Sequence, residues 1–336
     1  MEALFYIKLE DKKVKCRLCP HECEISNGKF GICKVRINKN GELFTENYGL
    51  VSSVGFDPIE KKPLYHFYPG SEILSVGSIG CNLQCDFCQN WQISQISETD
   101  FKRESKRYRN SEIIELALSK ENNIGIAYTY NEPTVFFEFM LEMAISAKEK
   151  GLKNVMVTNG FINKDPLNKL NQFIDAYNVD LKAFIDDFYI KYTKSQLEPV
   201  KETLINISNA GKHLEITNLV IPGLNDSPEK FEEMVKWIKE NTGEKTVLHI
   251  SRYFPSYKFK EEPTSVEKIF KLYEIAKKHL KYVYLGNLML SEGSNTYCPE
   301  CNELIIERSG YNTRLVALNK QGDCSSCGNH ILEHIK

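Results

Sequence analysis

Short apolar runs alternate with longer amphipathic stretches between residues 73 and 285. The apolar runs are rich in Val, Ile and Leu and are bounded by turn-forming residues, which is typical of strands buried on both faces. The predicted strands are residues 73–77, 125–130, 154–158, 176–181, 213–219, 246–250 and 282–285, and the predicted helices are residues 111–120, 133–149, 227–241 and 265–279. This alternation predicts a parallel sheet covered by helices.

Capping residues support several of these boundaries. Ser227 and Asp165 are each followed by a proline, and each pair provides a helix N-cap and a proline at the first helical position. A further helix is therefore expected to begin near Pro166. Gly151 follows the helix predicted at residues 133–149, where a glycine commonly ends a helix.

About seven strand and helix units suit two arrangements, a full or partial TIM-type (β/α) barrel and an open doubly wound sheet. The alternation is the same in both, so the pattern alone does not separate them. In a barrel the chemistry is expected at the carboxyl ends of the strands. Residues 35–69, before these units, are rich in turn-forming residues and predict short strands at one end of the main domain.

Composition narrows the class of protein. The 336 residues are 42% hydrophobic and 26% charged, with a net charge of -2 and no long basic run, which argues against a nucleic-acid partner. No apolar stretch approaches 18 residues, and the N-terminus has no signal-peptide core. We therefore expect a cytoplasmic protein without a membrane partner.

The eleven cysteines fall into three local groups. In a chain with no export signal, such grouping indicates metal ligation and not disulfides. The groups are Cys16, Cys19, Cys23 and Cys33; Cys81, Cys85 and Cys88; and Cys298, Cys301, Cys324 and Cys327.

The central group lies directly after the first predicted strand, with the spacing C-x3-C-x2-C. Three such thiolates can hold three corners of a cubane iron–sulfur cluster, which normally takes four, so one iron remains open. An open metal position is typical of a catalytic site. The alternatives are three buried structural cysteines or a zinc knuckle.

With Phe87 before its third cysteine, this loop resembles the signature of the radical S-adenosylmethionine (SAM) enzymes. The wider context resembles their activating-enzyme branch, similar to pyruvate formate-lyase activating enzyme, and more particularly the AmmeMemoRadiSam-system radical SAM enzyme. The resemblance runs from about Cys16 to the C-terminus. It favours the barrel over the open sheet.

The resemblance also implies cofactors, a reaction and partners. A [4Fe–4S] cluster on Cys81, Cys85 and Cys88 would bind SAM at its open iron and cleave it reductively to a 5′-deoxyadenosyl radical, which abstracts hydrogen from a substrate. The electron donor would be flavodoxin or ferredoxin. Association with AMMECR-family and Memo-family proteins is implied as well.

Residues at two strand ends match positions that contact SAM in the family. Asn131 and Glu132 stand where the family usually has Gly-Gly-Glu, so Glu132 is expected to bind the SAM ammonium, although the freedom of the glycine is lost. Thr158 and Asn159 match residues that bind the ribose hydroxyls. The alternatives are an acid favoured by a helix N-terminus and a plain Asn-Gly turn.

Further candidates follow the next strands. Asp180 and Lys182 alternate, so both face the same side of a strand, and Lys182 is expected to pair with the SAM carboxylate, unless the two form a structural ion pair. Ile221 matches the segment beside the adenine. The candidates for substrate contact lie in a segment that differs from the one found in activating enzymes, and they are His249, Arg252 and Tyr253.

The terminal cysteine groups predict closed metal sites. Cys16, Cys19, Cys23 and Cys33 can hold zinc or a second iron–sulfur cluster, and His21 can replace one ligand. Cys298, Cys301, Cys324 and Cys327 form two C-x2-C pairs, typical of a zinc ribbon whose hairpin would be residues 303–307 and 313–318.

We therefore expect three segments. These are an N-terminal cysteine-rich segment (residues 1–70), a radical SAM barrel (71–290) and a zinc-ribbon-like module (291–336). The function indicated is an activating-enzyme-like oxidoreductase that acts on a small molecule or a protein. The alternative is an iron–sulfur or zinc scaffold, or an electron-transfer protein, without SAM chemistry.

Overall fold

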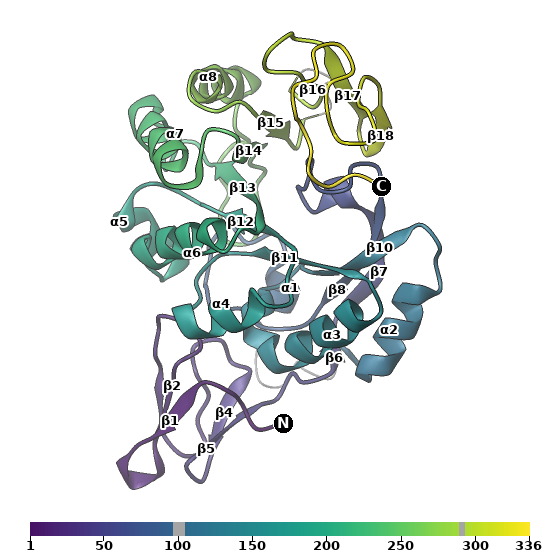
Figure 1. Cartoon of the computed structure of the whole chain (residues 1–336). Coiled ribbons are helices and arrows are strands. Elements are labelled where there is room, and N and C mark those ends of the chain that lie inside the picture. The colour runs from purple at the N-terminus through teal and green to yellow at the C-terminus, as the bar shows by residue number, and fades with distance from the viewer. Residues whose placement is uncertain (97–104, 289–292) are drawn as a thin grey trace.

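An eight-stranded sheet forms the centre of the computed structural model, which describes residues 1–96, 105–288 and 293–336 (Figure 1). The strands lie in the order β15-β14-β13-β12-β11-β10-β8-β7, and all but β7 run parallel to their neighbours. Their bounds are β7 Ser53–Pro58, β8 Glu72–Gly77, β10 Asn123–Tyr128, β11 Lys153–Thr158, β12 Ala176–Asp180, β13 His213–Val220, β14 Val247–Arg252 and β15 Val283–Gly286. In the described part of the chain the end strands β15 and β7 do not pair with each other, so the predicted barrel is confirmed in its partial form.

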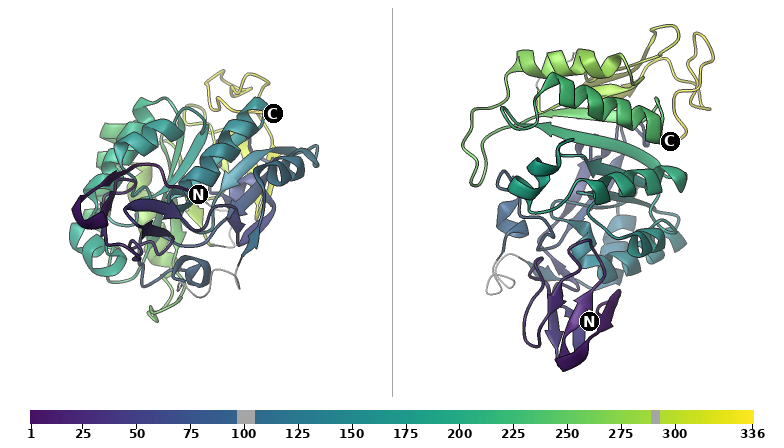
Figure 2. Two further views of the ribbon diagram at one scale, coloured as in Figure 1. Left: turned by 90° about the horizontal axis from the view of Figure 1, so that it is seen from below. Right: turned by 90° about the vertical axis from the view of Figure 1, so that its left-hand side faces the viewer.

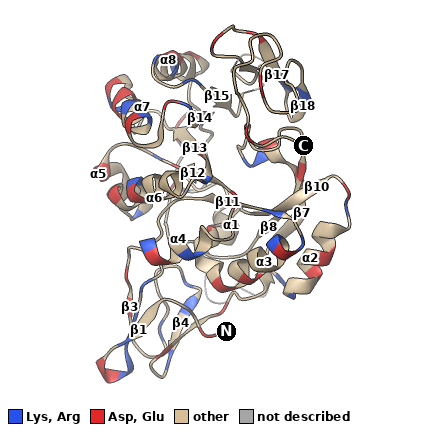
Figure 3. Ribbon diagram, viewed as in Figure 1, with Lys and Arg blue, Asp and Glu red and all other residues tan. Residues whose placement is uncertain are grey.

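Helices cover the outer face of this sheet (Figure 2). They are α2 Asn110–Leu118, α3 Phe137–Glu149, α4 Lys164–Leu170, α6 Glu198–Asn209, α7 Pro228–Thr242 and α8 Val266–Lys277. Charged residues of both signs are spread over these helices (Figure 3). None of the described helices has the length and apolar character needed to cross a bilayer.

Helix α6 was missing from the sequence prediction, which passed from residue 181 to residue 213 without a helix. Its buried residues Val200, Thr203, Leu204 and Ile207 have helical spacing, so the signal was present. The short helix α5 (Asp186–Phe188) and a π-helical turn (Tyr189–Thr193) also lie between β12 and β13.

Helix starts are partly as predicted. Ser227 caps α7 through its side chain, which accepts a hydrogen bond from the backbone N–H of Lys230. The prediction at Asp165 was wrong, because α4 begins one residue earlier, at Lys164, with Asn163 in the N-cap position. The helix predicted at residues 133–149 begins with a 3-10 turn, Pro133–Phe136, before α3.

The N-terminal segment lies at one end of the molecule (Figures 1 and 2). It contains β1 Tyr6–Lys8, β2 Val14–Cys16 and β3 Glu24–Ile25, which form one sheet, and the hairpin of β4 Arg36–Lys39 and β5 Glu42–Thr45. Strand β6 Leu50–Val51 pairs with β9 Lys106–Arg107. Because β7 joins the edge of the main sheet, that sheet begins before residue 71.

The C-terminal segment lies at the opposite end (Figures 1 and 2). Its strands β16 Thr296–Tyr297, β17 Leu304–Ser309 and β18 Asn312–Leu315 form an antiparallel sheet, so the predicted hairpin is confirmed. Arg308 on β17 is buried, with its guanidinium 4.2 Å from the centre of the Tyr65 ring and a hydrogen bond of 2.7 Å to the Tyr65 carbonyl. This contact joins the module to the segment between β7 and β8.

Candidate active site

A cavity of about 470 Å³ opens at the carboxyl edge of the sheet. This volume is within the range of about 300–1,000 Å³ that is usual for small-molecule sites. Residues that end or follow β8, β10, β11, β12, β13 and β14 line it, which agrees with the expectation for a barrel. Among the predicted site residues, the lining includes Cys81, Cys85, Cys88, Asn131, Glu132, Thr158, Asn159, Asp180 and Lys182.

The cysteine loop is held to the strand ends by side-chain amides. Asn131 accepts a hydrogen bond of 2.9 Å from the backbone N–H of Ser78 and donates one of 2.9 Å to the Gly80 carbonyl. Asn82 donates to the Phe161 carbonyl at 2.7 Å. Gly80 has a φ of +86°, a conformation that glycine adopts at little cost. The loop is thus positioned by residues far away in the sequence.

The three thiols fit the polynuclear centre that the spacing predicts. All three line one cavity, beside the apolar side chains of Leu83 and Phe87. Burial raises the pKa of each thiol, that of Cys85 to about 12, so thiolates form there when a metal binds. The three Sγ atoms do not all lie within 4.8 Å of one another, which is wider than thiolates bound to a single metal ion.

Glu132 presents a buried carboxylate to the cavity. Its Oε1 accepts hydrogen bonds from the Thr134 backbone N–H at 3.0 Å and the Thr158 hydroxyl at 2.7 Å, and its Oε2 accepts one from the Asn159 N–H at 2.8 Å. Burial raises the pKa of Glu132, although these hydrogen bonds act in the opposite direction. The carboxylate is therefore fixed, and it also caps the 3-10 turn that begins at Pro133.

Tyr130 has the backbone conformation of a glycine. Its φ is +73°, in the left-handed region that side chains disfavour. The residue before Asn131 thus holds a backbone conformation that glycine adopts more easily, and here a tyrosine holds it. The Tyr130 hydroxyl donates to Asp57, and the Lys62 ammonium lies 4.5 Å from the ring centre.

Asp180 and Lys182 form an ion pair in the wall of the cavity. Lys182 Nζ lies 2.8 Å from Asp180 Oδ2, and the side chains keep 15% and 36% exposure respectively. Burial by itself lowers the pKa of Lys182, but the nearby charge of Asp180 outweighs it and the net shift is upward. Lys182 is therefore a cation that a bound anion can reach.

Thr158 and Asn159 have protein partners for their polar side-chain atoms. The Thr158 hydroxyl donates to Glu132 and accepts from the Gly160 N–H at 3.1 Å. The Asn159 amide donates to Asn82 Oδ1 at 2.9 Å and lies 3.8 Å from Cys81 Sγ. Both side chains support neighbouring site residues.

Four predicted residues do not line the cavity. Ile221 is fully buried, and its backbone N–H bonds to Asn225. Arg252 donates to the Thr264 carbonyl, and the Tyr253 hydroxyl donates to the Phe259 carbonyl.

The fourth of these residues, His249, is paired with Glu215 in the interior of the sheet. Glu215 Oε2 lies 2.6 Å from His249 Nε2, and Oε1 lies 2.9 Å from His213 Nε2. Glu215 also accepts the backbone N–H groups of Tyr65 and His66. His249 is thus a hydrogen-bonded core residue.

Other lining residues were not predicted as site residues. Lys61 and Lys62 follow β7 and flank Asp57, which pairs with both at 2.7 and 2.8 Å. Ser251 and Asn287 line the side formed by β14 and β15. The two adjacent lysines were a detectable signal, but the antiparallel strand that brings them to the site was not foreseen.

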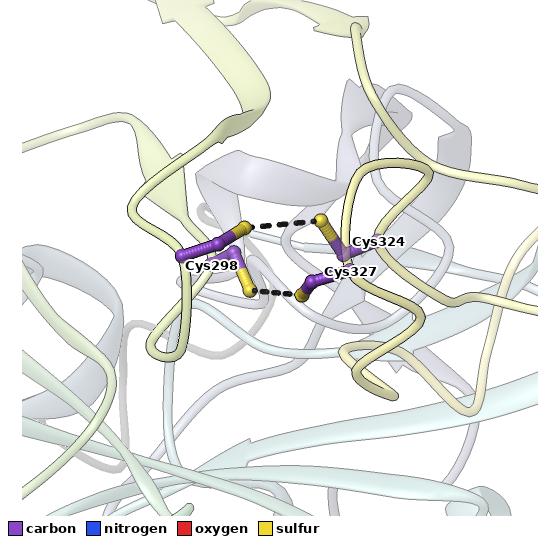
Figure 4. A group of neighbouring side chains, drawn as sticks. Cys298, Cys324 and Cys327 are labelled. Carbon is purple, nitrogen blue, oxygen red and sulfur yellow. Dashed lines mark hydrogen bonds between the residues drawn. The ribbon is translucent and has the colours of Figure 1, made fainter.

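The C-terminal cysteines converge on one point (Figure 4). The sulfur atoms of Cys298, Cys301, Cys324 and Cys327 all lie within 4.8 Å of one another. Cys298 and Cys327 are 3.5 Å apart, and Cys301 and Cys324 are 3.6 Å apart. This group can hold one metal ion in tetrahedral coordination.

Comparisons with known proteins agree with this fold and cavity. The model of the radical SAM superfamily matches residues 76–238. An uncharacterised protein of Methanocaldococcus jannaschii is 44% identical over 98% of both chains. The 4-hydroxyphenylacetate decarboxylase activating enzyme of Clostridioides difficile is 22% identical over 47% of this chain and 52% of its own length. Streptococcus suis SuiB, solved with S-adenosylmethionine, matches in fold with a TM-score of 0.50 and 16% identity, over 68% of this chain and 53% of SuiB.

The chain belongs to the radical SAM superfamily. It is an enzyme of a class that uses SAM for radical chemistry, and the resemblance to activating enzymes is confirmed.

Proposed function

We propose that Cys81, Cys85 and Cys88 hold a [4Fe–4S] cluster whose open iron binds SAM, and that the enzyme abstracts hydrogen from a substrate in the adjoining cavity. The observation that carries the proposal is that a fixed carboxylate, Glu132, and a cation, Lys182, line the same cavity as the three thiols. These two charges complement the ammonium and carboxylate groups of an amino acid.

The chain's own residues would bind and orient SAM. Glu132 would accept hydrogen bonds from the SAM ammonium group. Lys182 would donate a hydrogen bond to the SAM carboxylate while keeping its ion pair with Asp180. Leu219, which lines the cavity two residues before Ile221, takes the adenine contact that was predicted at Ile221. Asn159 is proposed to orient Cys81 and to contact the ribose through its remaining polar capacity.

The cavity would protect the chemistry from water. When bound, the cluster and SAM supply a reductive cleavage that produces a 5′-deoxyadenosyl radical. Leu83, Phe87 and Val157 contribute apolar surface around the site, which supports exclusion of solvent from a reactive species.

The substrate class is proposed from the relatives. The name of the Clostridioides difficile relative describes an activating enzyme, which supports a protein substrate for this chain too. The segment at His249, Arg252 and Tyr253, which departs from the activating-enzyme pattern, supports a small molecule instead. The electron donor is proposed to be flavodoxin or ferredoxin, and the association with AMMECR-family and Memo-family proteins would be tested by co-purification.

The test is formation of 5′-deoxyadenosine by anaerobically reconstituted, reduced protein supplied with SAM. We expect the nucleoside from the wild type and none from the Cys81→Ala, Cys85→Ala and Cys88→Ala triple variant. Cys301→Ala, which removes a thiol at the other end of the molecule, is the control and keeps the activity. A wild type that holds iron but forms no 5′-deoxyadenosine would instead support a scaffold or an electron-transfer protein.

A further inference from the structure

A second cysteine site lies in the N-terminal segment. Its four thiols line one small cavity: Cys16, Cys19, Cys23 and Cys33. Leu18, Ile25 and Val135 surround it with apolar surface. Cys16 is buried and the other three cysteines are partly exposed, so the site is enclosed but close to the surface.

The separation of these thiols distinguishes a cluster from a single ion. Four thiolates on one zinc ion, with bonds of about 2.3 Å, must lie close together, as the C-terminal group does. Apart from that C-terminal group, no three possible ligand atoms of the described residues lie within 4.8 Å of one another. No three of the N-terminal thiols therefore converge as closely as a single ion requires, whereas sulfurs bound to different irons of one cluster lie farther apart.

Two buried donors point to a ligand with acceptor atoms. Arg36 Nε and Thr134 Oγ1 belong to side chains that line the cavity, and neither has a hydrogen-bond partner among the described residues. The other nitrogens of the Arg36 guanidinium have partners: Nη2 lies 2.7 Å from both carboxylate oxygens of Glu138, and Nη1 donates to the Leu4 carbonyl at 3.2 Å. Inorganic sulfides and cysteine sulfurs of an iron–sulfur cluster accept such hydrogen bonds, which also tune its potential.

The space open to the centre of a water-sized sphere in this cavity is about 20 Å³, so the room between the surrounding atoms is larger than this volume. A bound cluster also needs less room than a molecule held by van der Waals contacts alone, because its metal–sulfur bonds of about 2.3 Å are much shorter than those contacts.

The two cysteine sites are adjacent, and consecutive residues of one loop line the two cavities. Cys81 lines the large cavity, and the next residue, Asn82, lines the N-terminal one. His21 Nε2 donates to the Asn82 carbonyl at 2.8 Å, and Asn82 Oδ1 accepts from Asn159, whose amide also lies 3.8 Å from Cys81 Sγ. Hydrogen bonds and one stretch of backbone thus connect the two sites.

Gly80 strengthens this junction from the other side. A Cβ atom at Gly80 would lie 2.7 Å from a Val35 methyl group and 3.0 Å from the Cys33 carbonyl oxygen. Only glycine therefore lets the backbone before Cys81 pack directly on the N-terminal cysteine site.

We propose that Cys16, Cys19, Cys23 and Cys33 hold a second iron–sulfur cluster, which passes single electrons through Asn82 to the Cys81 loop. The electron-transfer part of this proposal rests on the proposed function. An external one-electron donor protein is oxidised by one electron as the N-terminal cluster is reduced. That cluster is reoxidised when the electron moves on, so no proton or covalent bond changes at this site.

Metal analysis tests the cluster itself. In anaerobically reconstituted full-length protein, the Cys81/Cys85/Cys88→Ala variant should keep iron and sulfide in equal number, about four of each for a cubane. The reduced variant should give an electron paramagnetic resonance signal that SAM does not change. Zinc at this site in place of iron and sulfide would overturn the proposal, while leaving the proposed function intact.

A second pair of variants tests the contact between the cluster and its donors. Thr134→Val removes one hydrogen bond to the cluster, so the midpoint potential of the N-terminal cluster should become more negative while its iron content is unchanged. Thr246→Val, at the opposite end of the sheet, is the matched control and should leave the potential unchanged. An unchanged potential in Thr134→Val would contradict the assignment.

Reduction kinetics test the transfer. In a Cys16/Cys19→Ala variant the Cys81 cluster should keep its iron and its SAM-dependent spectrum, and dithionite should still reduce it. Reduction of the Cys81 cluster by flavodoxin or ferredoxin, measured as the loss of visible absorbance, should be at least tenfold slower than in the wild type. An equal rate would overturn the proposed electron transfer. A wild-type Cys81 cluster whose spectrum does not respond to SAM would instead contradict the proposed function.

Discussion

At the residue scale, the candidate site depends on charges whose positions are set by neighbouring groups. Glu132 is held by Thr134, Thr158 and Asn159, and Lys182 is held by Asp180. Because these side chains are already ordered, a ligand that binds them loses little additional conformational freedom.

Lys182→Met is expected to weaken SAM binding by about 10- to 100-fold, because a hydrogen bond to a charged group contributes about 1.5–3 kcal/mol. Asp180→Asn is the matched variant, since it keeps the lysine and frees it from its partner. Its SAM affinity should equal or exceed that of the wild type. Equal losses in both variants, measured by equilibrium dialysis of the reconstituted protein, would indicate a purely structural ion pair.

The affinity for SAM is also expected to depend on Glu132 ionisation. Burial raises the pKa of this carboxyl. On acidification Glu132 therefore becomes protonated at a higher pH than an ordinary glutamate. An ammonium group needs the ionised form, and affinity should therefore fall with decreasing pH and recover with increasing pH.

Glu132→Gln should bind SAM weakly at every pH and lose this dependence. Equilibrium dialysis between about pH 5 and pH 8 would measure this pH dependence of SAM affinity. An ordinary glutamate is fully ionised over most of that range and would not produce it. Glu229→Gln, an exposed change on α7, should behave as the wild type. Persistence of the same pH profile in Glu132→Gln would exclude this carboxylate as its source.

At the element scale, buried strands were readily predicted and their connections were not. The strand positions follow from apolar runs that only a sheet covered on both sides accommodates. Helix α6 was missed although its apolar spacing is regular. Strand β7 was not assigned to the main sheet because its antiparallel pairing with β8 is decided only when the chain folds.

Glu215 on β13 links strands and a loop in the interior of the sheet. Glu215→Gln is expected to lower the free energy of unfolding by about 3–5 kcal/mol, because it breaks a buried pair with His213 and His249 and disturbs the acceptor for two backbone N–H groups. Urea denaturation would measure it. Glu232→Gln, an exposed carboxylate that also pairs with a histidine, should cost less than about 1 kcal/mol.

The difference between these variants should depend on pH. Burial acts to raise the pKa of Glu215, but the two histidines outweigh it and the pKa is well below that of an ordinary glutamate. The stabilisation is therefore present above the unfolded-state pKa, and it is lost as the pH falls through the lower folded-state value. A difference that grows on acidification would contradict this assignment.

At the scale of the whole molecule, two cysteine-rich segments lie at opposite ends of the partial barrel. The N-terminal segment packs on the cysteine loop, and the C-terminal module packs on Tyr65 through Arg308. In a short module the bound metal supplies folding free energy, so its removal should loosen this end of the molecule.

Cys301→Ser is expected to lose about one metal ion per chain, predicted to be zinc, and to become sensitive to protease within residues 293–336, because a tetrahedral site needs all four ligands. Mass spectrometry of the fragments and metal analysis would measure both effects. Ser326→Ala, in the same segment, should keep the zinc and the resistance. Protease resistance without any metal would mean that packing alone holds the module.

The local pattern of residues determined the class of protein through its resemblance to a known family. Three cysteines within eight residues, directly after an apolar run and with Phe87 before the third, carry the resemblance to the radical SAM enzymes, because the positions of such thiols depend on only a few backbone angles. The same holds for the C-terminal C-x2-C pairs and for the alternation of strands and helices.

Only the tertiary structure decided which distant side chains share a cavity. Glu132 and Lys182 follow different strands, His249 belongs to the core, and Asn82 separates two cysteine sites. These relations depend on packing between segments that are far apart in the chain. No local pattern encodes them, because the contact energies that select them arise only when the sheet is assembled.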